Sequence, residues 1–218
     1  KGVLAAGLPI ALQEGLVNVS FLIITAMVNS MGLIASAAVG VVEKLLVFAF
    51  LPLTAFSSAV AAMTAQNIGA GRRDRAVRVL GCGIAWSLLF GGLFCLYAQF
   101  FPATLTRLFT NEAAVIAAAA DYLRSYSIDC VVVAVVFCMN AYFSGCGRAV
   151  ISLVHSLIAT FAVRIPLSFV LSRLPGGSLY PIGFAAPIAT AVSLVICLGY
   201  FFWESRKRRS AGSPAVSS

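Results

Sequence analysis

Charged residues are scarce in this sequence. They make up only 10% of its 218 residues, whereas about a quarter of the residues in soluble domains are charged, and the mean hydropathy is +1.01. Six stretches contain no Asp, Glu, Lys or Arg, and most of them hold the roughly 20 apolar residues that a helix needs to cross a bilayer. The shortage of charge excludes an ordinary soluble domain and predicts a membrane protein.

The sequence also lacks the motifs of common enzyme and metal sites. It has a single histidine, His155, and no HExxH, paired-cysteine, Walker A, GxGxxG or GxSG motif. Ser152 and Ser156 flank His155, but no nucleophile motif accompanies them. The six cysteines lie in or beside apolar stretches, where small buried thiols are common. We therefore expect no enzyme activity, no cofactor, no metal centre and no disulfide framework.

The apolar stretches are expected to be helices. Backbone groups inside a bilayer must pair within their own segment, and the alternation of apolar and polar residues typical of a barrel is absent. The predicted fold is all-α and polytopic, with six transmembrane helices. The spans are expected at about 9–31, 39–66, 77–101, 113–144, 150–171 and 181–203. The segment 205–218 is expected to be a disordered, basic cytoplasmic tail that contacts anionic lipid.

The basic residues divide unevenly between the two sides of such a bundle. With six spans both termini lie on one side, which carries ten of the fifteen Lys and Arg residues, whereas the other side carries only Arg107 and Arg173. The ten are Lys1, Arg72, Arg73, Arg75, Arg78, Arg148, Arg206, Lys207, Arg208 and Arg209. The positive-inside rule makes the richer side cytoplasmic, so the net charge of +8 reflects topology and not nucleic acid binding.

Polar residues inside the first span form a stripe. Glu14, Asn18, Thr25 and Asn29 share one helix face in an otherwise aliphatic segment. In one interpretation the stripe lines a cavity, and Glu14 binds a cation or exchanges a proton. In the other, Glu14 reaches toward the interface and the amides hold helices together.

Later spans carry further polar candidates. Asp129 and Asn140 are eleven residues apart and share a face, and Asp129 could carry a proton or pair with Arg124 or Arg164. Glu43 shares a face with Thr54 and could also face a cavity, whereas His155 and Arg164 lie on opposite faces, so at most one of them points at a given site. The full set of candidate cavity residues is Glu14, Asn18, Thr25, Glu43, Asp129, Asn140 and Arg164.

A series of short motifs resembles the multidrug and toxic compound extrusion (MATE) family. The motifs are "GLPIALQEGL", "VGVVEKLL", "AQNIGAGRRDRA", "NAYFSGCGR", "VRIPLSFVLSRLP" and "GFAAPIAT", and they follow the family's order over nearly the whole chain. The resemblance implies a transporter of two six-helix lobes that exports amphipathic or cationic compounds in exchange for H+ or Na+. This chain is similar to the C-terminal lobe, so its partner would be the N-terminal lobe of the same polypeptide.

The resemblance also bears on the site and on the coupling ion. It implies that Glu14, Asn18 and the polar positions of the fourth span face the central cavity. Sodium-coupled members have an acidic residue about twelve positions before the glycine that closes that helix. Counting back from Gly147 gives Val135, which favours H+ over Na+.

Two alternatives stay open at this point. A lipid-linked saccharide flippase of the same superfamily would have more cationic residues along its cavity than Lys44, Arg124 and Arg164 provide. A non-transporting scaffold or channel subunit would leave Glu14 and Asp129 without a role. In each case we expect a multi-pass protein of a bacterial plasma membrane.

Overall fold

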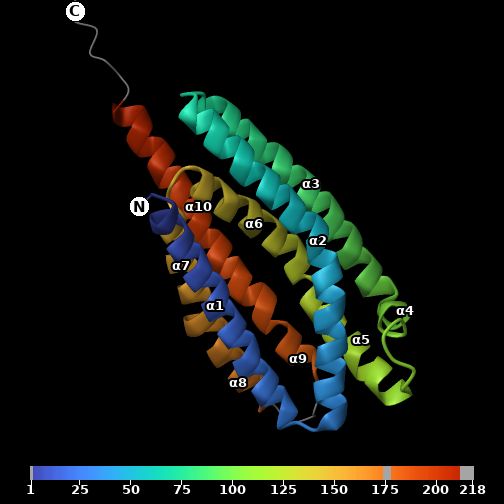
Figure 1. Ribbon diagram of the computed structural model, residues 1–218. Coiled ribbons are helices and arrows are strands. Elements are labelled where there is room, and N and C mark those ends of the chain that lie inside the picture. The colour runs from blue at the N-terminus through green and yellow to red at the C-terminus, as the bar shows by residue number, and fades with distance from the viewer. Residues whose placement is uncertain (1, 174–177, 212–218) are drawn as a thin grey trace, which may run out of the picture.

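The structure is a computed structural model that describes residues 2–173 and 178–211, and within these residues it is helical and has no strand (Figure 1). The helices are α1 (Gly2–Asn29), α2 (Leu33–Gly69), α3 (Arg73–Phe100), α4 (Pro102–Thr106), α5 (Ala113–Ser127), α6 (Asp129–Gly145), α7 (Ala149–Leu157), the π-helix η1 (Ile158–Arg164), α8 (Ile165–Ser172), α9 (Tyr180–Gly183) and α10 (Ala185–Ala211).

Within the described residues five helices are long and apolar enough to cross a membrane, and a sixth span results if α5 and α6 are counted together. The five are Ala11–Asn29, Leu33–Gly69, Arg73–Phe100, Ala149–Ser172 and Tyr180–Lys207. This confirms the all-α, multi-span prediction. Helices α2 and α3 begin earlier than predicted, at Leu33 and Arg73. Helix α2 starts directly after the turn at Gly32, which has a φ of 115°, and α3 extends beyond the apolar run because arginine is a good helix former.

The predicted fourth span is broken. Helices α5 and α6 meet at Ile128 with a bend of 45°. The hydroxyl of Ser125 donates to the Tyr122 carbonyl at 3.0 Å, and that of Ser127 donates to the Arg124 carbonyl at 3.0 Å. Such bonds compete with the helical backbone ladder and bend helices. As a result α6 begins anew at Asp129, which therefore lies at a helix N-terminus and not in a helix interior.

The fifth span also departs from a regular α-helix. Its middle is the π-helix η1, in which the Ile165 amide donates to the Thr160 carbonyl, five residues back. Pro166 follows directly, and proline has no amide hydrogen and crowds the carbonyl four residues before it. The wider π turn accommodates this proline, and it ends at Arg164.

The basic tail is partly helical. Helix α10 continues through the basic cluster to Ala211, so the expectation of a disordered segment from 205 is wrong for its first seven residues; residues 212–218 lie outside the described residues. Arginine and lysine are strong helix formers, and cations are favourable near a helix C-terminus. The Lys207 ammonium also lies over the Trp203 ring, 5.2 Å from its centre.

The buried apolar side chains of the described residues form three clusters, the smallest of which is Leu53, Val133 and Ala134 between α2 and α6. The two larger clusters lie toward opposite ends of the bundle. One joins α1, α2, α5 and α9 around Val28, Val42 and Leu123, and the other joins α2, α3, α6 and α10 around Val60 and Phe143. Helices α2 and α3 lie side by side along one edge, and α1, α7 and α8 lie on the opposite side (Figure 1). This arrangement leaves polar residues of the middle segments between two apolar ends.

Ion pairs hold the second end together. Glu204 of α10 accepts from Arg73 of α3 at 2.8 Å and from Arg148, which precedes α7, at 2.6 Å. Arg148 also donates to the Tyr200 hydroxyl at 2.6 Å. The end of α10 is thereby fixed to α3 and to the connection between α6 and α7.

Candidate functional site

A cavity of about 680 Å³ lies between the two larger apolar clusters. Its wall comes from α1, α2, α6, η1 and α10, with Tyr126 of α5 and Ser156 of α7. Six of the seven candidate residues line it: Glu14, Asn18, Glu43, Asp129, Asn140 and Arg164. The seventh, Thr25, is not part of the wall but lies beside the Glu43 carboxylate. The structure thus gathers the candidates from four segments at one place.

Arg164 is the cationic group of the cavity wall. Its guanidinium lies over the Phe21 ring, 4.1 Å from the ring centre, and donates to the Tyr126 hydroxyl at 3.1 Å. These contacts fix the cation against α1 and α5, because a guanidinium stacks favourably on an aromatic face. Arg164 comes from the end of η1, so the π turn before Pro166 sets its direction.

Asp129 is buried and forms no ion pair with another described residue. Only 4% of the residue is exposed, and its Oδ1 has no hydrogen-bond partner. Among the described residues, neither Arg124 nor Arg164 lies within ion-pairing distance of it, so the pairing alternative is not formed in the structure. The break at Ile128 explains this, because it points Arg124 outward on α5 and places Asp129 at the positive end of the α6 dipole.

The other two carboxylates occupy different settings. Glu43 of α2 is half-buried beside Thr25 and shares the cavity wall with the Arg164 guanidinium. Glu14 and Asn18 of α1 are exposed on the open side of the cavity. Nearby, the Gln13 amide donates to the Ser156 hydroxyl at 2.9 Å and connects α1 to α7.

His155 is a residue that sequence reasoning set aside. It is fully buried behind the cavity wall, with Nδ1 2.7 Å from the Ser193 hydroxyl and Nε2 2.7 Å from Asn140 Oδ1. A carbonyl oxygen only accepts, so Nε2 carries the hydrogen and the neutral Nδ1 accepts from Ser193. Asn140 therefore directs its amide hydrogens away from His155. The sequence indicated only that His155 and Arg164 lie on opposite faces of their span. In the structure Arg164 lines the cavity, and His155 lies behind the wall and holds Asn140 in place.

The lining groups combine charge with apolar surface. The wall contains three carboxylates and one guanidinium, together with the rings of Phe21, Phe50 and Phe137. Carboxylates and aromatic faces both attract cations, and apolar walls bind the remainder of an amphipathic molecule. Within the described residues no group of three or more His, Cys, Asp or Glu side chains is placed to hold a metal ion.

Comparison with known proteins agrees with this architecture. The MatE family model matches residues 9–170. The chain belongs to the MatE family. The resemblance drawn from the motifs is thereby confirmed, and the chain is a multi-pass membrane protein of the MATE type.

Several relatives are named as probable multidrug resistance proteins. The chain is 28% identical over 206 residues to the probable multidrug resistance protein YoeA of Bacillus subtilis, covering 94% of this chain and 44% of the relative. It is 24% identical over 176 residues to the probable multidrug resistance protein NorM of Thermotoga maritima, covering 79% of this chain and 37% of the relative. The chain thus spans less than half the length of these curated relatives.

Solved structures share the fold. An outward-facing multidrug resistance MATE family transporter of the MOP superfamily superposes with a TM-score of 0.85 at 16% identity, over 94% of this chain and 45% of the other. A MOP superfamily transporter from Pyrococcus furiosus, described as having a binding pocket of reverse polarity, gives 0.84 at 16% identity, over 92% and 44%. The described helices therefore have the arrangement of half a MATE transporter.

Proposed function

We propose that this chain is the C-terminal lobe of a secondary antiporter that exports amphipathic cationic compounds in exchange for protons. The observation that carries the proposal is the composition of the cavity. Glu14, Glu43 and Asp129 face one guanidinium, so the ionised wall has a net negative charge. Such a wall attracts organic cations, and Phe21 and Phe50 supply apolar contacts for the rest of the molecule.

The second lobe is expected to complete the site. Transporters of this type place substrate between two repeats near the midplane of the membrane. Here the open side of the cavity runs along α1, where Glu14 and Asn18 are exposed, and the chain spans less than half of its relatives' length. Alternating access then follows from rocking of one lobe against the other.

Asp129 is the residue best suited to exchange a proton within this lobe. Its carboxyl group is buried, has an oxygen without a hydrogen-bond partner and forms no ion pair among the described residues. It can therefore gain or lose a proton without breaking a salt bridge. The position that corresponds to the acid of sodium-coupled members is Val135, which has no oxygen to offer in its side chain. Both points favour protons as the coupling ion.

The cavity does not favour the flippase alternative. Of the three cations inside the spans, only Arg164 lines the cavity, whereas Lys44 and Arg124 are exposed elsewhere. A phosphate-linked sugar would require more positive charge than one guanidinium beside three carboxylates supplies. The scaffold alternative leaves the buried carboxylate of Asp129 without a function.

The test is gradient-driven uptake of a fluorescent cationic dye into inverted vesicles that contain the full-length transporter. A proton gradient and a sodium gradient are applied in turn, and Asp129→Asn and Glu14→Gln are compared with Asp121→Asn. Asp121 is an exposed acid of α5 outside the cavity and serves as the matched control. We expect proton-driven uptake that Asp129→Asn abolishes, Glu14→Gln weakens and Asp121→Asn leaves unchanged.

The opposite outcomes are equally clear. Uptake driven by sodium alone would reject the proton as coupling ion but would still support an exporter of cationic compounds. If no dye moves under either gradient while a lipid-linked sugar does, the flippase is the better function. Unchanged uptake in Asp129→Asn would remove this residue from the coupling mechanism.

A further inference from the structure

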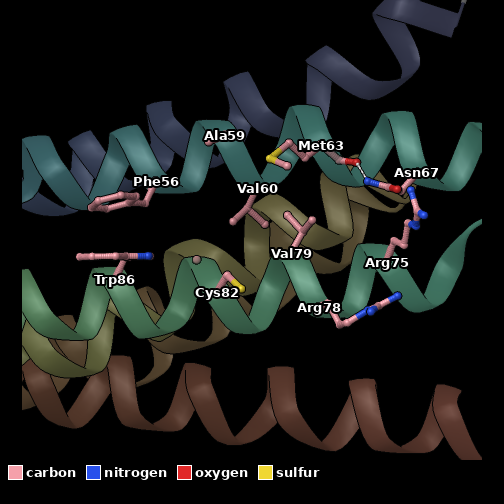
Figure 2. Close-up of a pocket in the computed structure, with 11 residues that line it drawn as sticks. Phe56, Ala59, Val60, Met63, Asn67, Arg75, Arg78, Val79, Cys82 and Trp86 are labelled. Carbon is pink, nitrogen blue, oxygen red and sulfur yellow. Dashed lines mark hydrogen bonds between the residues drawn. The ribbon is translucent and has the colours of Figure 1, made fainter.

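A second hollow lies on the outer side of the bundle, between α2 and α3 (Figure 2). It is an open groove of about 660 Å³ with an apolar wall that includes Ala59, Val60 and Cys82. At one end Phe56 and Trp86 stack, with ring centres 6.3 Å apart and planes inclined by 17°. At the other end Asn67, Arg75 and Arg78 surround the opening. We call it the α2–α3 groove.

The α2–α3 groove faces away from the cavity. With 100° per residue, the cavity residues Glu43, Val47 and Thr54 lie on one face of α2, and the groove residues Ala59 and Met63 lie on roughly the opposite face. Helix α3 is at the edge of the bundle, on the far side from α1 and α7 (Figure 1). A second lobe that meets the cavity therefore leaves this groove to the lipid bilayer.

The length of the groove matches one leaflet of a membrane. Trp86 follows Arg78 by eight residues and Arg75 by eleven, which is about 12 to 16 Å along a helix. The hydrocarbon core is about 30 Å thick, so each leaflet contributes about 15 Å. With the arginines at the level of the lipid headgroups, the Phe56–Trp86 pair lies near the midplane.

The two arginines at the opening carry positive charges that no described carboxylate neutralises. Arg75 and Arg78 are exposed, and within the described residues neither forms an ion pair, whereas Arg73 of the same turn is held by Glu204. Asp74 is the single acid of this segment, and it forms no ion pair with Arg78 one turn away. The Asn67 amide is bonded to the Met63 carbonyl at 2.7 Å. The opening is thus cationic and its strongest donors are free.

We propose that the α2–α3 groove binds an anionic phospholipid, with the phosphate at Arg75 and Arg78 and one acyl chain along Met63 toward Phe56 and Trp86. Charge complementarity selects the headgroup, because arginine forms strong charge-assisted hydrogen bonds with phosphate. The apolar wall selects an acyl chain, and the depth of one leaflet excludes a soluble anion as the natural occupant. Basic pockets between membrane helices have this combination of features.

Fluorescence quenching tests the site directly. The full-length transporter is placed in phosphatidylcholine vesicles that contain increasing fractions of phosphatidylglycerol brominated on its acyl chains. The quenching due to Trp86 is the difference between the parent and Trp86→Phe, which keeps an aromatic ring against Phe56. Brominated phosphatidylcholine has the same chains with a neutral headgroup and serves as the reference lipid. We expect phosphatidylglycerol to quench Trp86 at a several-fold lower fraction than brominated phosphatidylcholine.

Arginine substitutions then locate the headgroup. Arg75→Gln and Arg78→Gln should each raise the fraction needed for half-quenching by about fivefold. Arg72→Gln removes the same charge from the same turn, but Arg72 does not line the groove, so it should have little effect. Equal quenching by the two lipids in the parent would overturn the proposal without any arginine variant. If Arg72→Gln raised the half-quenching fraction as much as Arg75→Gln and Arg78→Gln do, the proposed site would be rejected. The quenching would then reflect general attraction of anionic lipid to a basic surface.

Discussion

At the scale of single residues, the cavity depends both on the residues that line it and on buried residues that hold the lining side chains in place. His155 contacts Asn140 and Ser193, which both line the cavity, but is itself buried behind them. The sequence showed a lone histidine between two serines, and spacing alone could not reveal partners on α6 and α10. What could be predicted was the stripe of α1 and the acids of α2 and α6, because polar residues stand out against an apolar background.

His155→Leu should destabilise the protein and weaken dye binding. It removes the partner of the half-buried Asn140 Oδ1 and that of the buried Ser193 hydroxyl, at a cost of about 1–2 kcal/mol. His155→Gln keeps a donor toward Asn140 and should recover part of the loss. Thermal unfolding in detergent gives the stability, and the concentration dependence of dye uptake gives the apparent affinity.

The neighbouring variant Ser156→Ala is the control for this prediction. It removes only the bond from Gln13 at a half-buried position of the same helix, so its effect should be smaller. Equal stability and affinity in His155→Leu and the parent would show that the histidine does not position Asn140.

At the scale of elements, the departures from regular helices place the site. The bend at Ile128 puts Asp129 at the start of α6, and the π-helix before Pro166 turns Arg164 toward Phe21. A departure from the regular helix near Pro166 follows directly from the sequence, because proline lacks an amide hydrogen. The sequence did not predict the break at Ile128, which depends on serine side chains that can bond either to their own backbone or to another helix.

Glycine permits the close approach of α3 to α6, and a single added methyl group should disturb it. A Cβ atom on Gly91 would lie 2.5 Å from the Cys130 carbonyl oxygen, which belongs to the backbone and cannot rotate away. Gly91→Ala should therefore destabilise the lobe by about 1–3 kcal/mol. Small residues at such contacts are typical of helix packing in membranes.

The adjacent Gly92→Ala provides the comparison. Nothing lies within 4 Å of its added Cβ, and alanine is the better helix former by up to about 1 kcal/mol, so this variant should be neutral or slightly more stable. Unfolding midpoints of the two variants in detergent decide the matter. A stable Gly91→Ala would mean that α3 and α6 can separate without cost.

At the scale of the whole molecule, the two ends of the bundle differ in chemistry. The end with the α2–α3 turn carries Arg72, Arg75 and Arg78 together with the Glu204 ion pairs. The opposite end is closed by an apolar cluster and carries the exposed Leu108 between α4 and α5. The helical class, the approximate number of spans and this asymmetry of charge could be predicted from the apolar stretches and from the positions of Lys and Arg along the chain. The sequence could not show which helix faces contact one another, because most faces of these helices are equally apolar.

We expect the end with the α2–α3 turn to face the cytoplasm, since positive charge is retained there during insertion. Single substitutions Ala70→Cys and Leu108→Cys place a thiol at an exposed position of each end. A membrane-impermeant maleimide should label Ala70→Cys in inverted vesicles and Leu108→Cys in intact cells, above the background of the parent. Cys82 contributes little background because it lies in the apolar α2–α3 groove. The reverse pattern would invert the orientation, and with it the leaflet in which Arg75 and Arg78 meet lipid phosphates.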